Sequence, residues 1–432
     1  MTDSELLIRG GTVVDATGSR RADVLVQGRT VAAVGPALDV PRGARVLDAG
    51  GCVVAPGLVD LHVHLRQPGR EEAETVATGA RAAALGGYTA IVAMPNTEPA
   101  IDCASAVREV LELGQSAVCD VRVAGAITKG RRGQELAAMA EMAELGVRLF
   151  TDDGTGVQDG LLMRRALEYA SALGVTLAQH CEDASLAAGG HMHEGEWSSR
   201  LGVPGVPAEA EELMVVRDLA LARLTAPLGS RMHFLHLSTA GSVAAVRAAK
   251  ASGLAVTAEA APHHFTLTDA SVAGYDSVFK VNPPLRSPAD VAAVKAGLAD
   301  GTLDAIATDH APHAPEDKER PFDHAPPGML GLETALALSL GELDLPVERV
   351  LALLSWQPAH IAGLEGIHGG PVAEGRPANL CVIDPSVVWV VDPDALASRS
   401  RNTPYAGRKL TGRARHTVLG GEPVVVDGEA QR

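Results

Sequence analysis

A pair of histidines separated by one residue, His62 and His64, lies in the segment LVDLHVH at the start of a long series of apolar runs. Side chains on an extended strand alternate between its two faces, so both imidazoles would point to one face and Val63 to the other. Histidine is the commonest metal ligand in proteins. The pair therefore predicts one side of a metal site, although an H-x-H pattern is a weak signal on its own.

Further metal-binding side chains follow other apolar runs. His180 comes after TLAQ, His236 comes after HFL, and carboxylates stand at Asp153 and Asp309. Three or four histidines with two aspartates suit one or two Zn²⁺ ions that keep a coordination position open for water. Because these residues all fall at the ends of apolar runs, chance accounts poorly for the whole set. The predicted metal ligands are His62, His64, Asp153, His180, His236 and Asp309.

The chemistry of such a centre is the activation of water. A metal ion would lower the pKa of bound water toward ~7 and polarise a carbonyl group. Asp309, at the end of the last expected strand, is the candidate general base that later returns the proton to a leaving nitrogen. The alternative is that Asp309 is a turn residue before His310. The residues on their own predict metal-assisted opening of an amide.

The segments around these residues alternate between apolar strand-like runs and Ala-rich stretches of helical period, as in TAIVAMPN followed by VREVLELG. About eight such units over some 290 residues have the size and rhythm of a (β/α)8 barrel. An open doubly wound sheet gives a similar alternation, but no G-x-G-x-x-G follows the first strand. We expect the barrel, because its strand ends meet at one mouth and would bring distant residues together.

Both chain ends have a different pattern of short, glycine-punctuated strand-like runs, such as ELLIRGGTVVD and HTVLGGEPVVVDG. Chain ends commonly lie close together in space. We therefore expect them to form one small β-sandwich-like domain beside the TIM barrel. The expected divisions are residues 1–55 and 371–432 for the two parts of the small domain, and 56–370 for the metal-dependent barrel.

Charge and composition narrow the possible partners. Lys and Arg number 37 against 53 Asp and Glu, a formal net charge of −16, so the chain lacks the basic face that nucleic acid requires. A single Arg can still bind an anionic small molecule. Five cysteines without a C-x-x-C argue against a disulfide framework, and we find no signal peptide and no run of ~18 apolar residues. We expect a soluble, cytoplasmic protein that binds no membrane.

The motifs PGLVDLHVHLRQPG, AMPNT, FTDDG, QHCED, HLST, APHH, VNPPLR and ATDHAPH, in this order, resemble those of the dihydroorotases of the amidohydrolase superfamily, in the bacterial class that bridges its metals with aspartate. The resemblance covers nearly the whole chain. It implies one or two Zn²⁺ per subunit and the interconversion of N-carbamoyl-L-aspartate and L-dihydroorotate, the third step of pyrimidine synthesis. We also expect a homo-oligomer, and association with aspartate transcarbamoylase stays open.

The resemblance also implies roles for individual residues. It favours Asp153 over Asp152 as the bridging ligand. Arg66, Asn96 and His313 would hold the substrate carboxylate, for which the planar fork of Arg is well suited. The resemblance further implies that Asn282 hydrogen-bonds the ring amide. For Asn96 and Asn282, each beside a proline, turn chemistry is the alternative.

The stretch 310–328, HAPHAPEDKERPFDHAPPG, is proline-rich, charged and without period, which predicts a long loop over the barrel mouth. Such loops often exclude water and deliver contacts to substrate. We expect its contributions to be His313 and the backbone around Pro327 and Gly328. Residues 316–320 fit a solvated surface excursion. His263 and His264 lie near the expected mouth without an assigned role.

Two alternative functions belong to different classes. Hydantoinases and allantoinases are barrels of the same superfamily that typically bridge their metals with a carboxylated lysine at the end of the fourth strand, where this chain has FTDDG. A catalytically silent dihydroorotase-like subunit that only scaffolds aspartate transcarbamoylase would be expected to have lost ligands, whereas all six are present. Gln67, where Glu is common, is a small departure. The resemblance therefore favours an active dihydroorotase.

Overall fold

Eight parallel strands form the barrel that the alternation of apolar and Ala-rich runs predicts. The computed structural model describes residues 5–431, and the strands follow one another around the barrel in sequence order. Single parallel bridges, Gly125 to Phe150 and Val63 to His310, join the three-stranded and five-stranded parts and close the barrel. The strands are β8 (Leu58–Val63), β9 (Tyr88–Ala93), β10 (Asp120–Val123), β11 (Leu149–Thr151), β12 (Thr176–Gln179), β15 (Arg231–Phe234), β16 (Val256–Ala260) and β17 (Ala305–Ile306). The expected fold class is confirmed.

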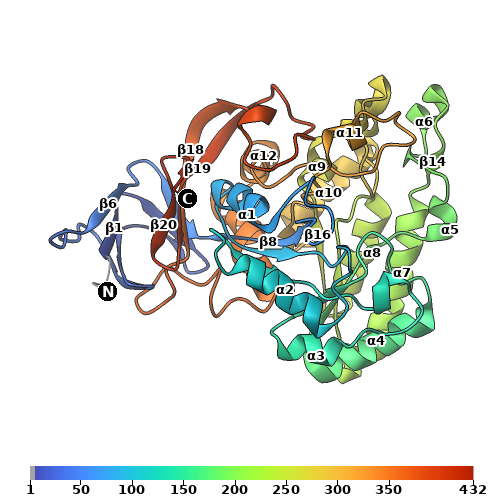
Figure 1. Cartoon of the computed structure of the whole chain (residues 1–432), viewed down its shortest axis with the longest axis horizontal. Coiled ribbons are helices and arrows are strands. Elements are labelled where there is room, and N and C mark those ends of the chain that lie inside the picture. Colours follow the sequence, from blue (N-terminus) through green and yellow to red (C-terminus); the bar gives the residue numbers. More distant parts are fainter. Residues whose placement is uncertain (1–4, 432) are drawn as a thin grey trace.

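Helices between the strands cover the outside of the barrel (Figure 1). Several begin after a residue whose side chain accepts a hydrogen bond from the first turn, as Thr75, Asp159 and Ser287 do. Their buried faces carry mostly Ala, Val, Leu and Met, which pack closely on the strands without aromatic rings. The main helices are α1 (Val76–Leu85), α2 (Ala104–Gly114), α3 (Met139–Glu144), α4 (Gly160–Leu173), α7 (Glu209–Thr225), α8 (Ala240–Ala251), α10 (Pro288–Asp300) and α12 (Ala335–Glu342). Within residues 5–431, no helix is long and apolar enough to cross a bilayer.

Long connections follow the carboxyl ends of β12, β16 and β17 and contain short elements. The first holds α5 (Ala184–Ala187), β13 (Met192–His193), α6 (Glu196–Leu201) and β14 (Gly205–Val206). The second holds α9 (Pro262–Thr266), η3 (Asp269–Gly274) and η4 (Ser277–Phe279), and the third holds α11 (Pro315–Lys318). The other short elements are η1 (Lys129–Arg131), η2 (Ala226–Leu228), α13 (Val347–Leu351), the π-helix η5 (Ala352–Trp356), α14 (Gln357–Ile361) and η6 (Pro393–Ala395).

Strands from both ends of the chain form a second unit beside the barrel (Figure 1). Its seven-stranded sheet has the order β21-β20-β19-β18-β7-β2-β3, and its four-stranded sheet has the order β5-β4-β1-β6. The two chain ends meet where β7 pairs antiparallel with β18. The strands are β1 (Glu5–Arg9), β2 (Thr12–Asp15), β3 (Gly18–Arg21), β4 (Asp23–Gln27), β5 (Thr30–Gly35), β6 (Arg45–Asp48), β7 (Val53–Pro56), β18 (Leu380–Val390), β19 (Lys409–Leu419), β20 (Glu422–Val426) and β21 (Glu429–Ala430).

An apolar cluster fills this second unit. Ile8 of β1, Val24 of β4, Val54 of β7 and Val382 of β18 are each completely buried in it. Since the cluster draws residues from both chain ends, neither end alone can bury its apolar face. The expected domain limits stay predictions, and residues 1–4 and 432 of the expected terminal parts lie outside the described residues.

The chain between β18 and β19 leaves this unit and lies against the barrel. We call residues 391–408 the β18–β19 connection. Two carboxylates of the barrel, one buried (Glu74) and one half-buried (Glu333), accept hydrogen bonds from it. Glu74 accepts from the Arg399 N–H at 3.0 Å and from the Ser398 hydroxyl, and Glu333 accepts from the Ala397 N–H at 2.8 Å. These contacts fix a C-terminal segment to loops that lead to the barrel mouth.

Burial of Glu333 gives a testable dependence of stability on pH. Burial raises the pKa of Glu333 from 4.5 to about 7, against the lowering effect of the Ala397 N–H. The folded protein then binds more protons than the unfolded chain between these values, so the contribution of Glu333 to stability is full below 4.5 and is lost as the pH rises through about 7.

We expect Glu333→Gln, which keeps an acceptor oxygen for Ala397, to remove part of the fall in thermal unfolding temperature between pH 5 and pH 8. The measurement is thermal unfolding of both proteins across this range. The control is Glu109→Gln, a change at an exposed position of α2, which should leave the pH profile of the wild type unchanged. Parallel profiles for Glu333→Gln and the wild type would contradict the assignment.

Candidate metal centre and active site

The six predicted ligands lie at the carboxyl ends of five barrel strands and face one another. All six side chains are buried. The imidazole ring of His62 lies with its centre 5.2 Å from the ring centres of both His64 and His236. A cavity of about 170 Å³ opens beside them at the barrel mouth. Each ligand lies in a barrel strand or within three residues after its end. The strands are β8 for His62 and His64, β11 for Asp153, β12 for His180, β15 for His236 and β17 for Asp309.

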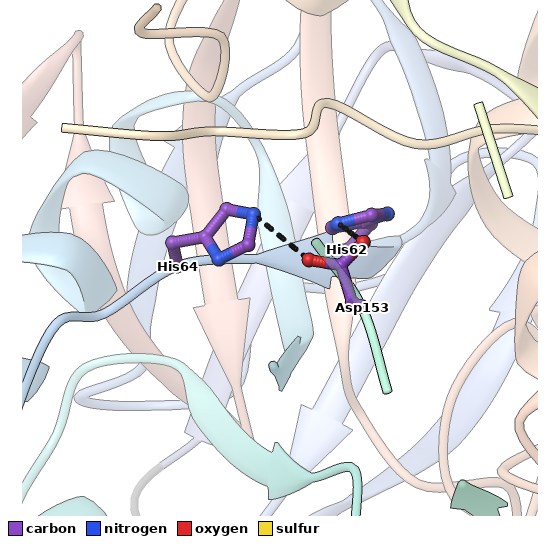
Figure 2. A group of neighbouring side chains, drawn as sticks. All are labelled: His62, His64 and Asp153. Atoms are coloured by element: carbon purple, nitrogen blue, oxygen red, sulfur yellow. Dashed lines mark ion pairs between the residues drawn. The ribbon is translucent and has the colours of Figure 1, made fainter. Parts of the chain in front are cut away.

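One group of possible metal ligands consists of His62, His64 and Asp153. Figure 2 shows both imidazoles directed toward the carboxylate. His62 Nε2 lies 3.4 Å from Asp153 Oδ1, and His64 Nε2 lies 3.6 Å from Asp153 Oδ2. Asp309 adjoins this group, with its Oδ1 at 3.4 Å from His62 Nε2 and 3.1 Å from His64 Nε2. The group therefore offers two imidazole nitrogens and two carboxylates.

A second group consists of Asp153, His180 and His236. Asp153 Oδ1 lies 3.4 Å from His180 Nδ1 and 3.6 Å from His236 Nε2, and these two nitrogens lie 2.9 Å apart. Asp153 thus belongs to both groups, and its Oδ1 lies near His62 of the first group and near both histidines of the second. Its neighbour Asp152 accepts hydrogen bonds from the Ile127 and Thr128 N–H groups at 2.9 and 3.0 Å and does not line the cavity.

Hydrogen bonds on the far side of the rings orient two of the imidazoles. His64 Nδ1 donates to Asn96 Oδ1 at 2.8 Å, and His62 Nδ1 donates to Glu259 Oε1 at 3.2 Å. Each bond fixes the ring with its Nε2 turned toward Asp153. His62 Nε2 has no hydrogen-bond partner among the described residues, as a metal-ligating nitrogen requires.

Sequence reasoning missed Glu259. It is completely buried in β16 and accepts hydrogen bonds from both His62 and His233, the latter through Nε2 at 3.0 Å. Burial alone would raise the pKa of Glu259, but the bonds from His233 and His62 lower it to about 2. The signal in the sequence is a single acidic residue inside the apolar run LAVTAEAA, which only a buried partner explains.

The charges of the cluster attract a cation. Burial alone would raise the pKa values of Asp153 and Asp309, but His62 and the other surrounding imidazoles hold both below their ordinary range. Two ionised carboxylates that are buried close together repel each other, and positive charge between them removes this repulsion. With the unpartnered Nε2 of His62, this donor set fits a divalent metal ion bound by nitrogen and oxygen ligands.

Six further predicted residues line the same cavity. The Arg66 Nε donates to the Pro312 carbonyl at 3.1 Å, and the Asn282 Nδ2 donates to Glu182 Oε2 at 3.1 Å. Burial lowers the pKa of Arg66 to about 10, which still leaves its guanidinium charged at neutral pH. The cavity-lining residues expected to contact substrate are Arg66, Asn96, Asn282, His313, Pro327 and Gly328.

The backbone around Pro327 and Gly328 is already engaged within the protein. The Pro327 carbonyl accepts from His313 Nε2 at 2.8 Å, and the Gly328 N–H donates to the Lys280 carbonyl at 2.8 Å. Gly328 has φ +139°, and a Cβ there would lie 2.8 Å from His313 Nε2, so a side chain has no room. These residues form a wall of the cavity in this conformation.

Three residues of the site have left-handed backbones that the sequence does not indicate. Arg66 has φ 59°, His236 has φ 31° and Asp309 has φ 48°. Non-glycine residues adopt such conformations at an energetic cost and do so mostly at functional sites. Each lies just beyond a barrel strand and faces the cavity, so the strain coincides with the predicted chemistry.

His263 and His264 stay outside the two ligand groups. His263 Nε2 is 4.0 Å from Asp309 Oδ2, and His264 Nε2 donates to the Pro283 carbonyl at 2.9 Å. Burial lowers the pKa of both rings, so they are neutral at ordinary pH. They pack beneath the mouth, with ring centres 4.3 Å apart.

Several known proteins with similar sequences are named dihydroorotase. The sequence model of the dihydro-orotase-like family matches residues 51–242. Proteins named dihydroorotase from Pelotomaculum thermopropionicum and Streptomyces coelicolor are each 50% identical to this chain, over 430 and 435 residues. The first alignment covers 98% of this chain and 99% of the relative, and the second covers 99% of both chains.

Solved structures with the same fold carry other names. The L-hydantoinase (dihydropyrimidinase) from Arthrobacter aurescens matches with a TM-score of 0.88 and 26% identity, over 100% of this chain and 98% of that one. The D-hydantoinase from Thermus sp. matches with a TM-score of 0.83 and 26% identity, over 98% and 96%. The sequence is far more similar to the proteins named dihydroorotase, with 50% identity along nearly its whole length. The chain therefore belongs to the dihydroorotase family.

Proposed function

We propose that this site catalyses the reversible closure of N-carbamoyl-L-aspartate to L-dihydroorotate, the third step of pyrimidine synthesis. The observation that carries the proposal is a half-buried guanidinium, Arg66, on the same cavity as two ligand groups that share Asp153. The guanidinium suits a substrate carboxylate, and the two ligand groups suit the making and breaking of an amide bond. The relatives named dihydroorotase support the same reaction.

The cation we propose is zinc, one or two ions per subunit. His62, His64 and Asp309 would hold one ion, His180 and His236 the other, and Asp153 would bridge them. Imidazole and carboxylate ligands with an open position are typical of catalytic zinc. When bound, zinc would polarise the substrate carbonyl and lower the pKa of the attacking water.

The residues on the other side of the cavity would bind and orient the substrate. Arg66 would meet the ring carboxylate with two parallel N–H donors. Asn96 has its Oδ1 occupied by His64, so its Nδ2 is the atom free to join Arg66 at the carboxylate. Asn282 has its Nδ2 on Glu182, so its Oδ1 would accept from the ring amide N–H. His313 would complete the carboxylate site beside Arg66, whose Nη2 lies 3.4 Å from His313 Nε2.

Asp309 would move the proton. In the ring-opening direction it accepts a proton from the attacking water as the new C–O bond forms, and it donates this proton to the ring nitrogen as the C–N bond breaks. Ring closure follows the same steps in reverse. Its carboxylate is ionised and so has a lone pair for this proton, because His62 and His64 keep its pKa below the ordinary value although burial opposes this.

The alternatives explain fewer of these features. A hydantoin ring carries no carboxylate of its own, so hydantoin hydrolysis would make no use of the guanidinium fork of Arg66. A silent scaffold subunit needs no intact ligand set, whereas all six ligands face one another here. Self-association, association with aspartate transcarbamoylase and a cytoplasmic location stay predictions.

The first test is the ring-opening assay on the purified protein with L-dihydroorotate, hydantoin and allantoin. We expect turnover of dihydroorotate alone. Asp309→Asn should lower kcat by at least about 10²-fold because the proton carrier is lost, while circular dichroism shows an unchanged fold. Preferred turnover of hydantoin, or wild-type kcat in Asp309→Asn, would overturn the assignment.

Arg66→Lys tests the carboxylate site. A lysine keeps the charge but loses the planar fork, so we expect KM for dihydroorotate to rise about tenfold or more, with a smaller change in kcat. Steady-state kinetics measure both constants. Arg164→Lys on the exposed face of α4 is the matched control and should leave KM unchanged. An unaltered KM in Arg66→Lys would remove Arg66 from substrate binding.

Glu259→Gln tests the support of the metal ligands. The amide can accept from one histidine but presents an N–H₂ to the other, so His62 loses its fixed orientation. We expect zinc affinity to fall about 10–100-fold, measured by competition with a chelating dye. Glu196→Gln, at an exposed position of α6, should bind zinc like the wild type. Equal affinity in Glu259→Gln would show that Glu259 only fills space.

A further inference from the structure

Two loops from different parts of the barrel form walls of the cavity, and the Gly328 N–H of one donates to the Lys280 carbonyl of the other at 2.8 Å. The substrate loop, residues 310–328 after β17, contributes His313, Pro327 and Gly328. The facing segment, residues 277–283 after β16, contributes Val281 and Asn282. The distance between these walls decides whether both can touch one small substrate.

Lys280 reaches from the facing segment into the substrate loop. Its Nζ donates to the Phe322 carbonyl at 2.8 Å and to the Asp323 carbonyl at 3.0 Å. The same ammonium lies 5.5 Å from the centre of the Phe322 ring, a cation–π distance. Lys280 stands two residues before Asn282, so the substrate loop is tied directly beside a cavity-lining residue.

Lys318 reaches in the opposite direction. Its Nζ donates to the carbonyls of Ser277 at 3.0 Å and Lys280 at 3.4 Å on the facing segment, and to Pro326 at 2.9 Å in its own loop. The Ser277 hydroxyl donates back to the Lys318 carbonyl. The expectation that residues 316–320 are a solvated excursion is thus wrong for Lys318, because three backbone carbonyls surround its ammonium.

The root of the substrate loop is fixed separately. Asn402 of the β18–β19 connection donates through Nδ2 to the carbonyls of Ala311 at 3.0 Å and Gly328 at 3.1 Å, and its Oδ1 accepts from the His313 N–H at 3.2 Å. Loss of the lysine contacts would therefore release the middle of the loop while its two ends stay in place.

Each lysine donates across the seam between the two walls, and neither touches the cavity. An ammonium withdrawn from water costs free energy unless its donors are satisfied, and here backbone carbonyls satisfy them, all but Pro326 in the other loop. We propose that Lys280 and Lys318 are positioning residues: a reciprocal clasp that sets the spacing of the two cavity walls and so contributes to substrate binding rather than to the chemical step. This role rests on the proposed function, because it concerns the binding of dihydroorotate.

The test uses the full chain with its metal and compares Lys280→Met, Lys318→Met and the double variant with the wild type. We expect each single change to raise KM for dihydroorotate about tenfold, the effect of losing hydrogen bonds from a charged donor, with kcat within about threefold. Lys280→Arg and Lys318→Arg, which keep charge and donors, should recover most of the loss. Lys295→Met, at a half-exposed lysine of α10 paired with Glu342, is the control and should match the wild type.

A second readout does not depend on activity. Chymotrypsin cleavage after Phe322, which is buried beneath Lys280, should be at least about tenfold faster in either methionine variant because opening of the loop exposes this bond. If the lysines act as one clasp, the double variant should resemble the worse single variant, because residues that share contacts are not additive.

Several results would overturn the clasp. These are wild-type KM and cleavage rates in both methionine variants, a fall in kcat at unchanged KM, or multiplied effects in the double variant. If a methionine variant fails to fold, Ser277→Ala removes only the hydroxyl given to Lys318 and should produce the same pattern at about threefold. Absence of dihydroorotase activity in the wild type would overturn the proposed function, while the cleavage rates would still decide whether the lysines hold the loop.

Discussion

The carboxylate of Asp153 is shared between two pairs of imidazoles, and the rest of the site is arranged around this interaction. His62 and His64 approach it from one strand, and His180 and His236 from two others. An ionised carboxylate can stay buried only when opposite charge or donors surround it. A closed barrel meets this need, because it brings the ends of distant strands within a few ångströms of one point.

The fold and much of this cluster could be predicted because both leave local marks in the sequence. Apolar runs alternating with Ala-rich stretches indicate the barrel, and metal-binding residues follow those runs at His62, His180 and Asp309. In a barrel every parallel strand ends at the same mouth. The type of a residue and its position after an apolar run are therefore enough to predict that its side chain lies there. The pairing of the chain ends also follows from their short, glycine-punctuated strands.

What could not be predicted depends on contacts between segments far apart in the sequence. Glu259 resembles an isolated acidic residue until His62 and His233 are seen to meet it. The left-handed backbone of Asp309 has no sequence signal, because tertiary contacts rather than local preference impose it. Lys318 stands in a charged, proline-rich run that is typical of exposed loops, and a segment some forty residues earlier in the chain supplies two of its three acceptors.

The β18–β19 connection bears on the order in which the parts of the site are made. Asn402 holds the root of the substrate loop, yet it follows Asp309, the last of the six predicted metal ligands, by 93 residues. A ribosome makes a chain from its amino end. All six predicted ligands are therefore synthesised before the asparagine that fixes this wall of the pocket.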